Sequence, residues 1–147
     1  MTILPDDPLG SGGIAVFAEA LRAGKTSAKK AVRAYLDRIE ALEPKLNAYQ
    51  FVAYEQAEEA AEAIDKLLAS GIDLGPLMGV PIAIKDIYAV ENMPTTNGSL
   101  YDASEITGPE GRYVTALKQS GCIILGKTKT VEYALGATGV NEARGTP

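Results

Sequence analysis

The sequence has 147 residues, of which 46% are hydrophobic, 22% charged and 6% aromatic. These fractions are those of an ordinary globular protein rather than a disordered one, and the length suffices for one hydrophobic core. The 14 basic and 19 acidic residues give a net charge of −5, which disfavours nucleic-acid binding through a basic surface. Because there is no histidine, this chain alone excludes Ser-His-Asp and Cys-His catalysis, and we expect no metal and no cofactor.

The single cysteine, Cys122, excludes an internal disulfide bond and suits a reducing compartment. It opens an apolar run, so we interpret it as a small core residue. No apolar run approaches the ~18–20 residues of a membrane span, and the first residues lack the basic start and apolar stretch of a secretory signal. We therefore expect a soluble cytoplasmic protein that does not bind membranes.

Residues 1–72 have helical patterns throughout. The first helix is predicted where apolar residues recur at helical spacing, and Gly24 stands where this helix would end. Its apolar positions are Ile14, Phe17, Ala18 and Leu21. A second helix is predicted to begin at a cap, Thr26 or Ser27, and Pro44 closes it from just outside.

A third helix is predicted over roughly 52–69, with Gly71 at its end. One side of this helix is rich in alanine, isoleucine and leucine, and the opposite side is rich in glutamate. We interpret the glutamate face as a solvated helix surface.

From residue 73 the composition turns to glycine, proline, threonine and short β-branched runs. Residues 80–84 form an apolar run that predicts a buried strand, and Pro81 places this strand's beginning or a sheet edge there. Residues 88–110 have the turn-rich composition of a long loop.

A helix is then predicted over 111–120, and a second buried strand over 122–125. The helix should direct three side chains inward, namely Tyr113, Val114 and Leu117. Strand, helix and strand in this order predict an α/β fold with a βαβ crossover and a parallel sheet that helices cover on both faces.

Lys85 follows the first predicted strand, at the end where α/β sheets place their ligands. Loss of hydration there favours the neutral amine of a lysine, which can then act as a base. Asp86 could orient Lys85 or pair with it. The alternative is a lysine that reaches solvent from the end of a strand, beside a surface aspartate.

Two further segments contain polar residues that could take part in chemistry. Residues 121–128 match the bare pattern GxxxxGK[ST], but the spacer Cys-Ile-Ile-Leu is strand-like, which disfavours nucleotide binding. The second segment has several hydroxyl and amide side chains in a turn-rich stretch. These side chains either line a polar pocket or stabilise the turn by local hydrogen bonds. Its residues are Thr95, Thr96, Asn97, Gly98 and Ser99.

Together, three segments resemble the amidase signature enzymes. Residues 74–86, Leu-Gly-Pro-Leu-Met-Gly-Val-Pro-Ile-Ala-Ile-Lys-Asp, resemble the family's Gly-Pro-Leu-x-Gly-[IV]-Pro-x-x-[IV]-Lys-Asp segment. Residues 93–99, Met-Pro-Thr-Thr-Asn-Gly-Ser, resemble the loop that follows this segment in the family. Residues 121–128, with Glu132-Tyr133-Ala134 and Gly136, resemble its Gly-x-x-x-x-Gly-Lys-Thr-Asn-x-x-Glu-Phe-Ala segment.

This resemblance implies the N-terminal portion of the amidase signature fold: helices, then the first strands of a mixed sheet covered by helices on both faces. It implies a Ser-cisSer-Lys triad in which Lys85 is the general base, with Asp86 supporting it and residues 95–99 in the pocket wall. A serine would attack the amide carbonyl, and water would then release the acid from the acyl-serine. The missing histidine fits this scheme.

The chain departs from the family pattern at Lys129, where asparagine is common. The family's Gly-Gly-Ser-Ser-Gly-Gly-Ser stretch would follow Pro147, so both serines are expected beyond it. We therefore expect residues 1–147 to be part of one amidase domain, with 1–72 helical and 73–147 starting the α/β core. Alone, this part should be inactive.

The expected activity is hydrolysis of a carboxamide to carboxylate and ammonia or amine, with a small-molecule amide as substrate. One alternative is the glutamine amidase subunit of an aminoacyl-tRNA amidotransferase, although residues 95–99 look more like stand-alone amidases. Another is a noncatalytic truncated or split-protein module, which should expose apolar surface. A homodimer, or complementation by the missing C-terminal part, remains open.

Overall fold

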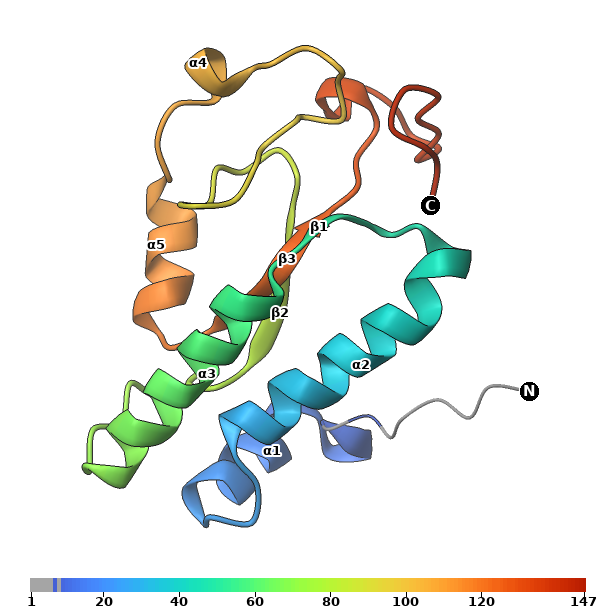
Figure 1. The fold of residues 1–147 in the computed structure, drawn as a ribbon. Helices are drawn as coiled ribbons and strands as arrows, with labels where there is room; N and C mark the ends of the chain where they lie inside the picture. The colour runs from blue at the N-terminus through green and yellow to red at the C-terminus, as the bar shows by residue number, and fades with distance from the viewer. Residues whose placement is uncertain (1–6, 8) are drawn as a thin grey trace.

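The computed structural model describes residues 7 and 9–147, and its chain trace is shown in Figure 1. The helical elements are η1 (Gly10–Gly12), α1 (Gly13–Arg22), α2 (Ala28–Leu46), α3 (Tyr54–Ala69), α4 (Ser104–Thr107), α5 (Arg112–Gln119) and η2 (Glu132–Ala134). The strands are β1 (Tyr49–Val52), β2 (Pro81–Lys85) and β3 (Ile123–Thr128). This is the predicted α/β architecture of helices and a small mixed sheet.

The sheet has the order β1-β3-β2, with β3 in the centre. β2 runs parallel to β3 and reaches it through α5, which confirms the predicted βαβ crossover. β1 runs antiparallel to β3, so the sheet is mixed and not parallel as the order strand, helix, strand predicted. Since β2 is an edge strand that begins at Pro81, the missing amide hydrogen of this proline interrupts no central ladder.

Helices cover both faces of the sheet (Figure 1). α2 and α3 pack on one face, where Ile123 and Leu125 of β3 point, and α5 packs on the other, where Ile124 points. This alternation follows from the two-residue period of a strand. The cluster on the first face consists of Ala28, Val32, Leu36, Ala57, Ala61, Ile64, Met78, Ile123 and Leu125. Cys122 is buried, as expected for a core residue.

β1 was not predicted, because residues 1–72 were expected to be helical throughout. The four residues of this strand are half-buried and show no alternation, so local periodicity does not indicate a strand there. The strand is defined by a long-range contact: Val52 is paired with Gly126 of β3. At Gly126 the backbones approach so closely that a Cβ atom would collide with the carbonyl oxygen of Phe51.

Three smaller expectations need correction. Pro44 lies inside α2, in its last turn, rather than just outside it. The helix ends at Leu46, and the left-handed φ of 48° at its cap, Asn47, is one that asparagine tolerates. Tyr113 is 59% exposed and its ring lies against Tyr88, although Val114 of the same helix is buried. β3 continues to Thr128, three residues past its predicted end.

Candidate active site

Lys85 is the last residue of β2, and the loops that follow β2 and β3 lie at the same end of the sheet (Figure 1). Its side chain is exposed and makes no hydrogen bond or ion pair with the residues that the structure describes. The expected loss of hydration at Lys85 is therefore not found within this chain. The position is the carboxyl edge of a parallel strand pair, where α/β proteins bind ligands.

Asp86 has the opposite environment, because its carboxylate is fully buried. Lys127 Nζ donates to Asp86 Oδ1 at 3.0 Å, and Thr96 donates to Asp86 Oδ2 from its hydroxyl at 2.5 Å and from its amide at 3.2 Å. The backbone of Asp86 is also fixed, since its amide donates to the carbonyl of Thr128 at 2.9 Å. Asp86 thus pairs with Lys127 rather than with Lys85.

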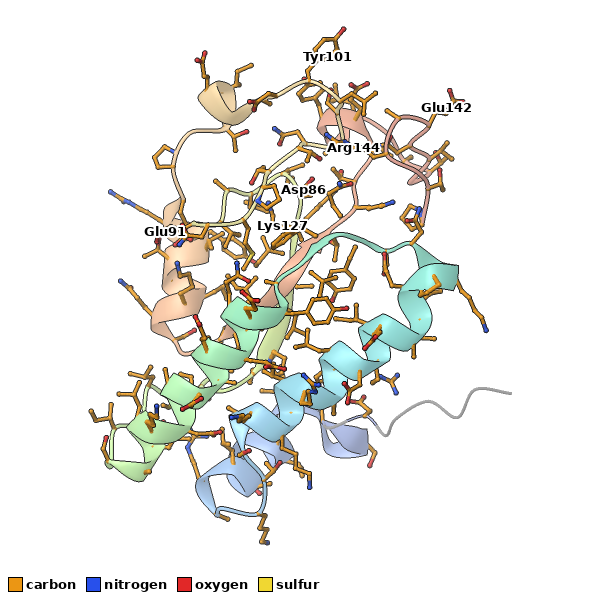
Figure 2. All side chains as sticks on the ribbon, in the orientation of Figure 1. Asp86, Glu91, Tyr101, Lys127, Glu142 and Arg144 are labelled. Carbon is orange, nitrogen blue, oxygen red and sulfur yellow. The ribbon has the colours of Figure 1, made fainter. Side chains whose placement is uncertain are left out.

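Lys127 is the largest side chain among the fully buried residues. Its ammonium group donates to Asp86, to the carbonyl of Pro94 at 3.1 Å and to Thr95 Oγ1 at 2.8 Å, so three acceptors match its three N–H bonds. Burial lowers the pKa of Lys127, and the adjacent Asp86 carboxylate opposes this shift. Figure 2 shows the two side chains side by side at the end of β3.

The polar turn at 95–99 is built around this ion pair. Thr95 and Thr96 contact Lys127 and Asp86 directly, and the amide of Asn97 donates to the carbonyl of Asp86 at 3.0 Å. Asn97 has a φ of 53°, which asparagine tolerates better than most residues.

The other end of the turn is held by the segment that follows β3. Ser99 is buried and donates to the carboxylate of Glu132 at 2.7 Å, and Asn141 donates to the carbonyl of Gly98 at 2.7 Å. Gly98 is required here, because a Cβ atom would lie 2.7 Å from the carbonyl oxygen of Thr130. The structure therefore brings the turn together with Asp86, while the Lys85 side chain is exposed and makes no hydrogen bond or ion pair with either among the described residues.

Lys127, Glu132 and Asn141 were not predicted as part of this site. Glu132 and Lys127 stand in the quoted motifs, and a charged residue after a run of buried apolar residues is a signal for a buried ion pair. The partner could not be identified, because Asp86 is 41 residues away in the chain. The P-loop interpretation was rightly disfavoured, since Lys127 lies within β3 and its ammonium group is enclosed.

A cavity of about 780 Å³ opens beside the turn, between the loop after β2 and α5. Val90 and Met93 contribute apolar surface, and Thr95 lines both this cavity and the ion pair. Glu110 is on the cavity wall; burial raises its pKa, but hydrogen bonds from the Glu91 amide, Lys118 and Thr115 outweigh burial and lower the pKa overall. Among the described residues, no cluster of Cys, Asp or Glu side chains could hold a metal ion.

Comparison with known proteins places the chain in a family. The sequence model of the family described as Amidase matches residues 30–147. A glutamyl-tRNA(Gln) amidotransferase subunit of Acidothermus cellulolyticus is 41% identical over 129 residues, which are 88% of this chain and 26% of that protein. The 2-amino-5-chloromuconic acid deaminase of Comamonas testosteroni is 45% identical over 106 residues, 72% of this chain and 23% of that protein.

Among solved structures, native peptide amidase from Stenotrophomonas maltophilia superposes with a TM-score of 0.84 at 27% sequence identity, covering 96% of this chain and 30% of that one. The chain therefore belongs to the amidase signature family, which confirms the resemblance seen in its motifs. It spans about a quarter of the length of the curated relatives that it matches. In the described part of the chain, no helix is long and apolar enough to cross a membrane.

Proposed function

We propose that this chain is the N-terminal part of an amidase that hydrolyses a carboxamide to a carboxylate and ammonia or an amine. Lys85 acts as the general base, and the two serines of the Ser-cisSer-Lys triad lie beyond Pro147. The substrate is a small-molecule amide, and the protein is cytoplasmic and uses no cofactor. Residues 1–147 alone are inactive, because the nucleophile that attacks the carbonyl is not among them.

The observation that carries this proposal is the separation of two neighbouring charged groups. The carboxylate of Asp86 is engaged in a buried ion pair with Lys127, whereas the amine of Lys85 is accessible at the carboxyl edge of the sheet. A general base must reach the proton that it abstracts, so an accessible amine at this edge suits the role. Residues 95–99 are proposed as one wall of the pocket: the turn stands beside Asp86, and Thr95 is the residue of the turn that lines the cavity.

The proposal is tested by comparing this chain with any longer product of the same reading frame. We expect the longer product to hydrolyse amides and to be labelled by a serine-directed sulfonyl fluoride, and the 147-residue chain to do neither. If the longer product fails in both assays, the amidase proposal is wrong. Turnover by the 147-residue chain itself would contradict the placement of the serines beyond Pro147.

A second candidate is the glutamine amidase subunit of an aminoacyl-tRNA amidotransferase, which would use glutamine as its amide. Three relatives that are glutamyl-tRNA(Gln) amidotransferase subunits favour it, at 40–41% identity over 86–88% of this chain. Glutamine hydrolysis that depends on partner proteins would support this candidate. Hydrolysis of unrelated amides by the isolated longer product would support a stand-alone amidase.

A noncatalytic module is the candidate from a different class. Its support is the exposed apolar surface expected of a truncated domain, which the structure contains in the segments after β2 and β3. The most exposed of these side chains are Leu100, Tyr101, Ile106 and Leu135. If no longer product of the reading frame exists in cells, this candidate replaces the amidase proposal.

A further inference from the structure

The ion pair between Asp86 and Lys127 differs from every other ion pair of the described residues. Both of its side chains are enclosed, with exposures of 1% and 0%, whereas each of the other pairs has a partner that is at least 41% exposed. Burying two charges loses hydration, and an apolar pair of similar volume is often as stable. The enclosed pair is therefore better explained by a function than by stability.

That function follows from the position of Asp86 next to Lys85. The two side chains leave the end of β2 in opposite directions, one into the interior and one toward solvent. Without a cation beside it, the Asp86 carboxylate would be a desolvated negative charge one residue from the amine. A nearby negative charge favours the protonated form of an amine, which cannot act as a base.

We propose that Lys127 neutralises the charge of Asp86. The carboxylate can then fix the end of β2 and the turn at 95–99 by its hydrogen bonds, without favouring the protonated form of the Lys85 amine. Lys127 and Asp86 are thus positioning residues for the base. This inference rests on the general-base role proposed for Lys85.

Lys127 cannot be the base itself, because its side chain is fully buried and its three N–H bonds are donated to Asp86, Pro94 and Thr95. The other charged groups near this end of the sheet are engaged elsewhere. Lys129 donates to Asn47 at 2.6 Å and to the carbonyl of Arg144 at 2.7 Å, and on α5 Lys118 pairs with Glu110 at 3.1 Å. Glu132 accepts from Ser99 at 2.7 Å, and Arg144 donates to the carbonyl of Ser99 at 2.9 Å. Asp86 is the charged residue directly next to Lys85 in the chain, and Lys127 is its partner.

The first test uses the 147-residue chain and needs no enzymatic activity. Lysine amines are labelled by ¹³C-reductive methylation, and the titration midpoint of Lys85 is followed by NMR. Lys127→Met should move this midpoint to higher pH by about one unit, and Asp86→Asn should move it to lower pH. The double variant Asp86→Asn/Lys127→Met should restore the original midpoint.

Lys129→Met is the matched control, because it removes a half-buried lysine from the same end of β3 without touching Asp86. It should leave the Lys85 midpoint unchanged. If Lys127→Met does not fold, as judged by circular dichroism, the near-isosteric Asp86→Asn decides the test. A folded Lys127→Met or Asp86→Asn variant with an unchanged Lys85 midpoint overturns the inference.

The second test measures amide hydrolysis by the longer product as a function of pH. In Lys127→Met, the acid limb of the kcat/KM profile should move to higher pH, and the double variant should return it. A purely structural role would lower the rate at every pH and leave the limb in place, which would overturn the inference. If the unmodified longer product shows no hydrolysis, the proposed function fails, while the NMR titration still decides the role of Lys127.

Discussion

At the scale of single residues, the end of β2 sends two neighbouring charged side chains to opposite environments. Asp86 lies inside a network of donors from Lys127 and Thr96, whereas Lys85 faces solvent. The contacts of Asp86 therefore fix the backbone at the end of β2, and the amine of the preceding residue, Lys85, stays accessible to solvent. Such an arrangement suits a group that must meet a substrate or another segment of the protein.

Replacing Lys85 with alanine should abolish turnover by the longer product. The expected fall in kcat is about two to four orders of magnitude, as for the loss of a general base. Lys45→Ala is the control, because Lys45 is an exposed residue in the last turn of α2, and its rate should match the unmodified protein. Near-normal turnover by Lys85→Ala would exclude Lys85 as the base.

A tyrosine near the start of the chain gives a prediction about pH. Burial raises the pKa of Tyr35 to about 12, and the hydrogen bond that its hydroxyl donates to Asp7 at 2.5 Å adds to this shift. Since the folded state holds this proton more tightly than the unfolded chain, the stabilisation is complete below pH 10 and is lost as the pH rises from about 10 to about 12.

The ultraviolet absorbance of tyrosinate measures this ionisation. The difference between the titration curves of the unmodified chain and Tyr35→Phe should have its midpoint near pH 12. The comparison is needed because burial also raises the pKa of Tyr49. A difference curve centred near pH 10 would show that Tyr35 is not held in this hydrogen bond.

At the scale of elements, the sequence predicted the helices and strands that a local pattern defines. It missed β1, which is defined by pairing with a distant strand. The strand at Pro81 and the helix at 112–119 follow from an apolar run, a turn composition and helical spacing. β1 has no such pattern, and it exists because its backbone pairs with β3 more than 70 residues later. For the same reason Lys85 was proposed from its motif, whereas the pairing of Lys127 with Asp86 could be seen only in the packed structure.

The close approach of the β1 and β3 backbones at Gly126 gives a prediction about β1. Gly126→Ala would push a methyl group against the carbonyl of Phe51, so β1 and β3 must separate. We expect a loss of about 1–3 kcal/mol in the free energy of unfolding, which urea denaturation measures. Amide hydrogen exchange should also speed up at Ala53, whose N–H donates to the carbonyl of Leu125 at 2.8 Å.

Gly111→Ala is the control for this prediction, because a Cβ atom at Gly111 would meet open space. This variant should leave the exchange at Ala53 unchanged. If Gly126→Ala exchanges at Ala53 as slowly as the unmodified chain, the β1–β3 pairing does not depend on the glycine.

At the scale of the whole molecule, one part is well covered and another is not. On the first face of the sheet, α2 and α3 enclose a core of mostly buried side chains. At the carboxyl end of the parallel strands, the segments after β2 and β3 are joined by the hydrogen bond between Ser99 and Glu132. These segments still present large apolar side chains to solvent. Since the chain spans about a quarter of its curated relatives, we expect the remainder of the amidase domain to cover this surface.

Two residues of this surface allow a direct test, because Ile106 and Leu135 are 85% and 87% exposed. The 147-residue chain should bind a hydrophobic fluorescent dye, and Ile106→Asp/Leu135→Asp should bind several-fold less. Val16→Asp is the control: Val16 is 54% exposed on α1, away from these segments, and its replacement should change dye binding little. The longer product should bind less dye per molecule than the 147-residue chain, because its additional residues cover the same side chains. Equal dye binding by the two proteins would mean that this surface stays open in the complete domain.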